Sequence, residues 1–229
     1  MSLKALIFDL DGVLTDTAKY HYLAWKKLAD ELGYYFDADI NELLKGVSRI
    51  NSFEIILEKN NATDKYTPEE KESLANKKND YYKEMIEQLT PNDVLEGIVP
   101  FITEARNNGI KCAVASISKN APRVLELLKI SELFDYIADA ALVKQPKPHP
   151  EIFLTCAKAL GFEPNECIGI EDAQAGIESI HSAGMFSVGI NVTITSVKPD
   201  VILKSTKELN YNKIVKNFNQ NQVCNNESL

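Results

Sequence analysis

The sequence contains little that would attach the protein to a membrane or to a nucleic acid. No stretch approaches the roughly 18 consecutive apolar residues of a membrane-spanning helix, and the first residues lack a signal-peptide pattern. Lys and Arg total 25 against 33 Asp and Glu, and the resulting net charge of -8 argues against a nucleic-acid-binding surface. We therefore expect a cytoplasmic protein, taken as a monomer, with no nucleic-acid and no membrane partner.

The cysteines also show no spacing typical of a redox pair or a zinc site. The four cysteines form no CxxC pair and no zinc-ligand spacing, and they stand at Cys112, Cys156, Cys167 and Cys224. Cys112 and Cys167 fall within apolar runs that we expect to be strands. We interpret the cysteines as reduced core thiols.

Length and composition favour one main domain with a smaller insertion. A chain of 229 residues is long for one core but short for two of full size, and 45% hydrophobic with 25% charged residues is typical of a globular protein. From about residue 17 to 90 the pattern is purely helical. Thr67-Pro68-Glu69-Glu70 predicts a capped helix start. The helices expected in this block cover residues 18–33, 40–45, a stretch from 48, and 67–89.

Strands and helices alternate after Asn92. The expected strands cover residues 110–116, 136–139, 167–170 and 187–190, and the expected helices 119–129, 150–161 and 173–184. With a first strand over 4–8, this alternation predicts an α/β fold with a doubly wound, Rossmann-like parallel sheet. We expect a catalytic core of residues 1–16 and 92–216, an inserted all-helical cap of 17–91, and a disordered Asn- and Gln-rich tail of 217–229.

The first strand ends in two aspartates spaced by one residue. Asp9 and Asp11 follow the apolar run Leu6-Ile7-Phe8, and Gly12 allows the chain to turn away. Carboxyl ends of parallel strands are where open α/β sheets bind ligands. Two carboxylates there can converge on one cation or one reacting group, although a bare Asp-x-Asp also occurs as solvated loop acids.

Three more polar sites stand at expected strand ends. Ser116 closes one strand, Lys147 lies in the turn Gln145-Pro146-Lys147-Pro148, and Glu171-Asp172 ends another strand. The acids suit Mg²⁺, which prefers oxygen ligands. Ser116 and Lys147 offer a donor and a positive charge to phosphoryl oxygens.

The order of these sites resembles the four signature motifs of the haloacid dehalogenase superfamily, over nearly the whole chain. The resemblance implies that Asp9 is a covalent nucleophile, and that Asp11 is the general acid/base and lends its backbone carbonyl to the metal. Dehalogenases of the group use one catalytic Asp without Mg²⁺, so Asp11 and the acid pair favour phosphoryl transfer. The implied metal residues are Asp9, Asp11, Glu171 and Asp172, and the implied phosphate-binding residues include Ser116, Ile117 and Lys147.

The helical block holds several polar residues with two interpretations each. Thr17, His21 and Trp25 share one helix face, but His21 and Trp25 also fit a packed cap interior. Arg49 suits a phosphate clamp at a helix start, or a solvated surface position. Lys78 falls on an otherwise apolar stripe, where it either snorkels or faces a wet cleft, and Lys77 is nearly as well placed.

The resemblance narrows to the beta-phosphoglucomutase family. It is carried by Thr17, His21 and Trp25 together with Lys45-Gly46-Val47-Ser48-Arg49, Lys78-Asn79-Asp80 and Ser116-Ile117-Ser118-Lys119-Asn120. It implies that Arg49, Ser118, Lys119 and Asn120 hold the non-transferring phosphate, that Lys78 and the Gly46-Val47 turn contact the sugar, and that His21 couples cap closure to alignment of the acid/base. Ser52 is assigned to the same cap site, and Thr17 matches the hinge. Gln145-Pro146 departs from the family, where small residues are usual.

The resemblance implies a Mg²⁺-dependent mutase that interconverts beta-glucose 1-phosphate and glucose 6-phosphate through a bisphosphate. A sugar-phosphate phosphatase using the same Asp9 is the alternative, because both enzymes share the phosphoaspartate and differ in the acceptor. A non-catalytic binding protein is a third possibility, against which the intact Asp9, Asp11, Lys147 and Asp172 argue.

Overall fold

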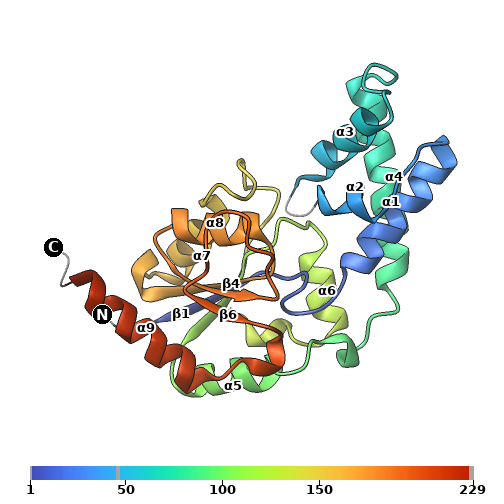
Figure 1. Cartoon of the computed structure of the whole chain (residues 1–229). Coiled ribbons are helices and arrows are strands. Elements are labelled where there is room, and N and C mark those ends of the chain that lie inside the picture. The colour runs from blue at the N-terminus through green and yellow to red at the C-terminus, as the bar shows by residue number, and fades with distance from the viewer. Residues whose placement is uncertain (1, 45–46, 227–229) are drawn as a thin grey trace. The chain divides into compact units, whose positions relative to one another are not determined.

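The computed structural model describes residues 2–44 and 47–226, with side chains up to residue 221 (Figure 1). The chain divides into two compact units. The core unit contains the residues up to 16 and those from 90 onward, and the cap unit contains residues 17–89. The second boundary therefore lies two residues before the expected one at 91/92.

The core unit is built on one six-stranded, all-parallel sheet. Its strands are β1 (Ala5–Phe8), β2 (Lys111–Val114), β3 (Tyr136–Ile137), β4 (Cys167–Glu171), β5 (Phe186–Ile190) and β6 (Val201–Leu203). Their spatial order is β3-β2-β1-β4-β5-β6, so β1 and β4 are neighbours at the point where the chain order reverses. The predicted doubly wound parallel sheet is confirmed.

Helices cover both faces of the sheet, and Figure 1 shows α7 and α8 on one side and α5 and α9 on the other. The core helices are α5 (Ile98–Asn107), α6 (Ala121–Leu127), α7 (Glu151–Leu160), α8 (Gln174–Ser182) and α9 (Tyr211–Asn226), with short 3-10 turns at Pro91–Asp93, Ser131–Leu133, Pro164–Glu166 and Thr206–Glu208. Within β1 the side chains alternate between the faces. Ile7 packs with α7 and α8, while Phe8 meets Phe101 of α5 at a ring-centroid distance of 6.3 Å.

The expectation of a disordered tail from residue 217 is wrong for the residues that the structure describes. Helix α9 continues to Asn226. Phe218 is fully buried and meets Phe186 of β5 edge to face, with ring centroids 5.7 Å apart. The polar composition concealed one apolar stripe, Tyr211, Ile214 and Phe218, whose spacing of three and four residues is helical.

The described part of the cap unit contains four helices, α1 (Ala18–Leu32), α2 (Ala38–Glu42), α3 (Arg49–Lys59) and α4 (Pro68–Ile86). The start of α4 is the predicted capping box: Thr67 Oγ1 accepts from Glu70 N, and the Glu70 carboxylate accepts from Thr67 N. The expected helix over 40–45 is wrong at both ends. Asp37 caps α2 by accepting from Ile40 N at 2.9 Å, which starts the helix at Ala38, and the helix ends at Glu42.

Among the described residues, none of the helices has both the length and the apolar character needed to cross a membrane.

Candidate active site

Three carboxylates meet at the carboxyl ends of the central strands. Asp9 follows β1, and its backbone N–H donates to the carbonyl oxygen of Ile170 in β4 at 2.9 Å, which fixes it beside that strand. Glu171 ends β4 and Asp172 follows it. One carboxylate oxygen from each of Asp9, Glu171 and Asp172 lies within 4.8 Å of the others. The border of β1 and β4 is the reversal point where open α/β sheets bind ligands.

Lys147 lies in the loop between β3 and α7 and connects two of these acids. Its buried Nζ donates to Oδ1 of Asp9 at 2.6 Å and to Oε1 of Glu171 at 2.5 Å. The other Glu171 oxygen, Oε2, accepts from the backbone N–H groups of Asp172 and Ala173, both at 2.9 Å. Both oxygens of Glu171 are thus engaged, and this carboxylate fixes the ammonium group next to Asp9.

The burial of this cluster changes its acidity. Burial raises the pKa of Asp9 from 3.8 to about 6; the Lys147 ammonium opposes that rise and the Glu171 carboxylate adds to it. For Lys147, burial alone lowers the pKa, but the two carboxylates outweigh it and the pKa is raised. At neutral pH Asp9 is therefore ionised and Lys147 is cationic, as a nucleophile beside a charge-neutralising group requires.

Two glycines allow the backbone to approach the acids. Gly12 has a φ of +77°, and a Cβ there would lie 2.1 Å from Oδ2 of Asp172. A Cβ on Gly176 of α8 would lie 2.0 Å from the Glu171 carboxylate. Any larger residue at either position would displace an acid of the cluster.

Asp11 lies in the turn that follows, and its carboxylate is not one of the three clustered ones. The turn closes on itself: Gly12 N donates to Thr15 O at 2.8 Å, and Leu14 N donates to Leu10 O at 2.9 Å. Thr15 in turn donates through Oγ1 to Asp93 O at 2.8 Å. The turn that carries Asp11 is thereby held by two backbone hydrogen bonds and by the hydroxyl of Thr15.

The loop after β2 carries the expected phosphate-binding residues. Ser116 is buried at the strand end, and its Oγ accepts from Ser118 N at 3.1 Å. Oγ of Ser118 accepts from Asn120 N at 3.3 Å, and Asn120 precedes the first residue of α6. Lys119 is exposed, whereas Ile117 packs on the apolar core. Sequential hydroxyl-to-backbone bonds hold this loop in one shape.

A second polar cluster lies inside the cap unit. Nζ of Lys78, on α4, is 2.8 Å from Nδ1 of His21, on α1. The His21 ring stacks on Tyr82 at 4.0 Å, and the ammonium lies 4.7 Å from the centroid of the Trp25 ring. Lys78 is only 3% exposed, so its ammonium group neither reaches the surface solvent nor faces a wet cleft in this structure. Lys77 instead pairs with Glu31 on the surface.

His21 is neutral in this environment. Burial lowers its pKa well below 6.5, and the positive charges of Lys78 and Arg49 lower it further. An ammonium group is only a donor, so the neutral imidazole accepts at Nδ1 and carries its proton on Nε2. His21 therefore presents an N–H donor on the side away from Lys78.

The remaining predicted cap residues occupy different settings. Trp25 stacks on Phe53 within the apolar core of the cap, which fits its packing interpretation. Thr17 and Ser52 are buried, and Val47 is partly buried. The Oγ1 atom of Thr17 has no hydrogen-bond partner among the described residues. Gly46 lies outside the described residues.

Two residues that the sequence did not single out support the cap site. Tyr82 is fully buried under His21. Its spacing of four residues from Lys78 on α4 was the available signal. Asn76 accepts from Nη1 of Arg49 at 2.9 Å, and no pattern pointed to that contact because it joins two helices.

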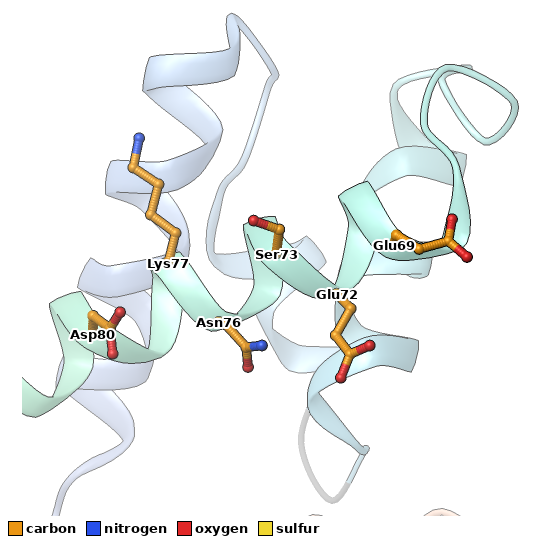
Figure 2. Close-up of a pocket in the computed structure, with 6 residues that line it drawn as sticks. All are labelled: Glu69, Glu72, Ser73, Asn76, Lys77 and Asp80. Carbon is orange, nitrogen blue, oxygen red and sulfur yellow. The ribbon is translucent and has the colours of Figure 1, made fainter.

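An open hollow runs along the outer face of α4. It is lined by Glu69, Glu72, Ser73, Asn76, Lys77 and Asp80 (Figure 2). These side chains come from one helix and include none of the clustered acids. We therefore place the chemistry at Asp9.

Comparison with known proteins agrees with this fold. A family model described as haloacid dehalogenase-like hydrolase matches residues 3–184, and the chain belongs to that family. It is 44% identical over 221 residues to the beta-phosphoglucomutase of Bacillus subtilis (strain 168), covering 96% of this chain and 98% of that protein. A crystal structure of beta-phosphoglucomutase from Clostridium difficile matches with a TM-score of 0.92 and 47% identity, covering 96% of this chain and 99% of that one.

A phosphatase is a more distant relative. The fructose-1-phosphate phosphatase YqaB of Escherichia coli (strain K12) is 30% identical over 191 residues, covering 82% of this chain and 96% of that protein. The chain is thus a close homologue of beta-phosphoglucomutases, and the comparisons support the mutase interpretation more than the phosphatase interpretation.

Proposed function

We propose that this protein is a Mg²⁺-dependent beta-phosphoglucomutase, which interconverts beta-D-glucose 1-phosphate and D-glucose 6-phosphate through an aspartyl-phosphate enzyme and glucose 1,6-bisphosphate. The observation that carries the proposal is the contact of Asp9 with Lys147, beside Glu171 and Asp172, at the reversal point of the sheet. Similarity to two beta-phosphoglucomutases over nearly the full length supports the substrate.

The residues of the cluster fit a magnesium ion, because all its donor atoms are oxygens. Asp9, Asp172 and the backbone carbonyl of Asp11 would hold it, and the ion would neutralise charge on the transferring phosphoryl group. We assign Glu171 chiefly to holding Lys147, because both of its oxygens already accept hydrogen bonds. Of the four acids that we expected to bind magnesium, Asp9, Asp11 and Asp172 therefore remain as ligands.

Asp9 and Asp11 divide the chemistry. The phosphorylated Asp9 gives its phosphoryl group to the 6-hydroxyl of glucose 1-phosphate, while Asp11 takes the hydroxyl proton. After the bisphosphate turns around, a carboxylate oxygen of Asp9 attacks the phosphorus at C1, the bond to the sugar oxygen breaks, and Asp11 returns the proton to that oxygen. Glucose 6-phosphate leaves, and Asp9 is phosphorylated again. Lys147, Ser116 and the backbone at Ile117 bind the phosphoryl oxygens.

The cap supplies the contacts that a mutase needs beyond this chemistry. The buried Lys78, together with Gly46 and Val47, would bind the sugar. His21, whose Nδ1 contacts Lys78, would couple cap closure to the alignment of Asp11, and Thr17 would lie at the hinge of the cap. Trp25 and Ser52 shape the cap from within. Arg49, with Ser118, Lys119 and Asn120 of the core unit, would clamp the phosphate that is not being transferred.

This function implies a small sugar phosphate as the substrate. We further propose that the protein acts in the cytoplasm and that it is a monomer. Reduced thiols suit that compartment: Cys112, Cys156 and Cys167 are free and buried.

Phosphorus NMR tests the proposal. Purified protein is mixed with beta-glucose 1-phosphate, Mg²⁺ and a trace of glucose 1,6-bisphosphate. Glucose 6-phosphate as the product supports the mutase. Free phosphate as the product rejects it in favour of the sugar-phosphate phosphatase.

A further inference from the structure

Arg49 is held in place by the helix that packs beside it in the cap unit. It begins α3, directly after the N-cap residue Ser48, and its Nη1 donates to Oδ1 of Asn76, in the middle of α4, at 2.9 Å. The two residues are 27 positions apart, so the contact is a tertiary one. It fixes one edge of the guanidinium group relative to α4.

The partner of Arg49 is a neutral amide, and this affects how Arg49 can bind an anion. A guanidinium group has five N–H donors, and the bond to Asn76 occupies one of them, so this bond leaves the others able to bind an anion. The amide oxygen is neutral and orients the group without cancelling its charge. Asp80 lies one turn further along α4 (Figure 2). Burial lowers the pKa of Arg49, and the Asp80 carboxylate opposes that shift. A guanidinium group is not deprotonated in proteins, so Arg49 stays charged.

We propose that Asn76 is a positioning residue for the phosphate clamp: it orients Arg49 toward the non-transferring phosphate of a sugar bisphosphate and leaves its charge intact. This inference rests on the proposed mutase function. A long arginine side chain without this bond samples more rotamers, and ligand binding then has to order it. Asn76 is itself exposed and adds nothing to the apolar core. Its loss should therefore affect binding far more than folding.

Two substitutions separate orientation from charge. Asn76→Ala removes the acceptor, and we expect it to weaken binding of glucose 1,6-bisphosphate roughly threefold to tenfold. Asn76→Asp keeps an acceptor of the same shape but adds a carboxylate that pairs with the guanidinium, and we expect a larger loss. The matched control is Ser73→Ala, an exposed position three residues earlier that lines the same hollow. It should bind as wild type does.

Further readouts distinguish positioning from a structural role. Both Asn76 variants should melt close to wild type, and acetyl phosphate, which has no second phosphate, should label Asp9 at the wild-type rate. In an Arg49→Ala background, Asn76→Ala should add no further loss, because it acts through Arg49. An undiminished effect of Asn76→Ala in that background would overturn the proposal, as would wild-type bisphosphate affinity in both Asn76 variants.

Failure of the inference can be told from failure of the proposed function. The positioning role alone is rejected if two results occur together. The wild-type protein forms glucose 6-phosphate, and Asn76→Ala binds the bisphosphate as tightly as Ser73→Ala does. Wild-type protein that yields only free phosphate rejects the mutase, and with it the clamp.

Discussion

The ammonium nitrogen of Lys147 lies 2.6 Å from Oδ1 of Asp9, the carboxylate that we propose as the nucleophile. Glu171 holds the same ammonium from the other side. A phosphoryl group transferred to Asp9 would meet a cation that is already in place. Such a preorganised charge stabilises the transition state without further reorganisation.

We expect Asp9 to titrate near pH 6 in the magnesium-free protein, because burial raises its pKa from 3.8 to about 6. Between these values the folded protein holds a proton that the unfolded chain has released. The free energy of unfolding should therefore fall as pH rises from about 4 to 6, and this contribution should level off above 6. Carbon NMR of the carboxylate and urea unfolding measure the two effects. A slope that persists unchanged in Asp9→Asn would contradict the assignment.

Lys147→Met should destabilise the protein strongly. It leaves two buried carboxylates without their counter-charge, a change that typically costs about 3–5 kcal/mol. The loss should be largest above pH 6, where Asp9 is ionised. Lys111→Met is the control, because Lys111 forms an exposed pair with Asp135 and should lose less than about 1 kcal/mol. Urea denaturation at pH 5 and 7.5 compares them, and equal losses in both variants would refute the buried pair.

Asp11→Asn should lower turnover by about 10²–10⁴-fold and leave magnesium binding nearly unchanged. The variant keeps the backbone carbonyl but loses the proton carrier, which typically contributes about 10²–10⁴-fold to the rate. Steady-state kinetics over a range of magnesium concentrations gives both quantities. Weaker magnesium binding with normal turnover at saturation would show that Asp11 is a side-chain ligand instead.

Phe218→Ala should destabilise the core unit by about 3–5 kcal/mol, because it empties a fully buried position between α9 and β5. Asn219→Ala, on the exposed side of the same helix, should change stability by less than about 0.5 kcal/mol. Thermal unfolding of the two variants is the measurement. A wild-type melting temperature for Phe218→Ala would mean that α9 does not support the sheet.

The sheet was predictable because its strands are continuous apolar runs that end in chemically distinctive residues. Asp9, Ser116 and Glu171 each follow or end such a run, whereas Lys147 stood out as a cation in a proline-flanked turn before a helix. Parallel topology then brings Asp9, Lys147 and Glu171 together. Helix α9 was not predicted, because its three buried apolar residues lie among many Asn, Gln and Lys residues. The polar composition of the segment suggested disorder, although the spacing of the apolar residues is helical.

The cap was less predictable, because its polar contacts join helices that are far apart in sequence. Periodicity left Lys77 and Lys78 nearly equivalent, and only packing buries Lys78 against His21. The partner of Arg49 had no signal at all, since an exposed Asn on a helix is ordinary until its tertiary neighbour is known.

The central claim is that Asp9 carries a phosphoryl group from one sugar position to another. Protein labelled at Asp9 by radioactive acetyl phosphate, freed of the donor and chased with beta-glucose 1-phosphate in a rapid-quench experiment, tests it directly. We expect an acyl-phosphate label in wild type and none in Asp9→Asn. The chase should move the label into glucose 1,6-bisphosphate and then glucose 6-phosphate. Label released as inorganic phosphate, at the same rate with and without the sugar phosphate, would contradict it.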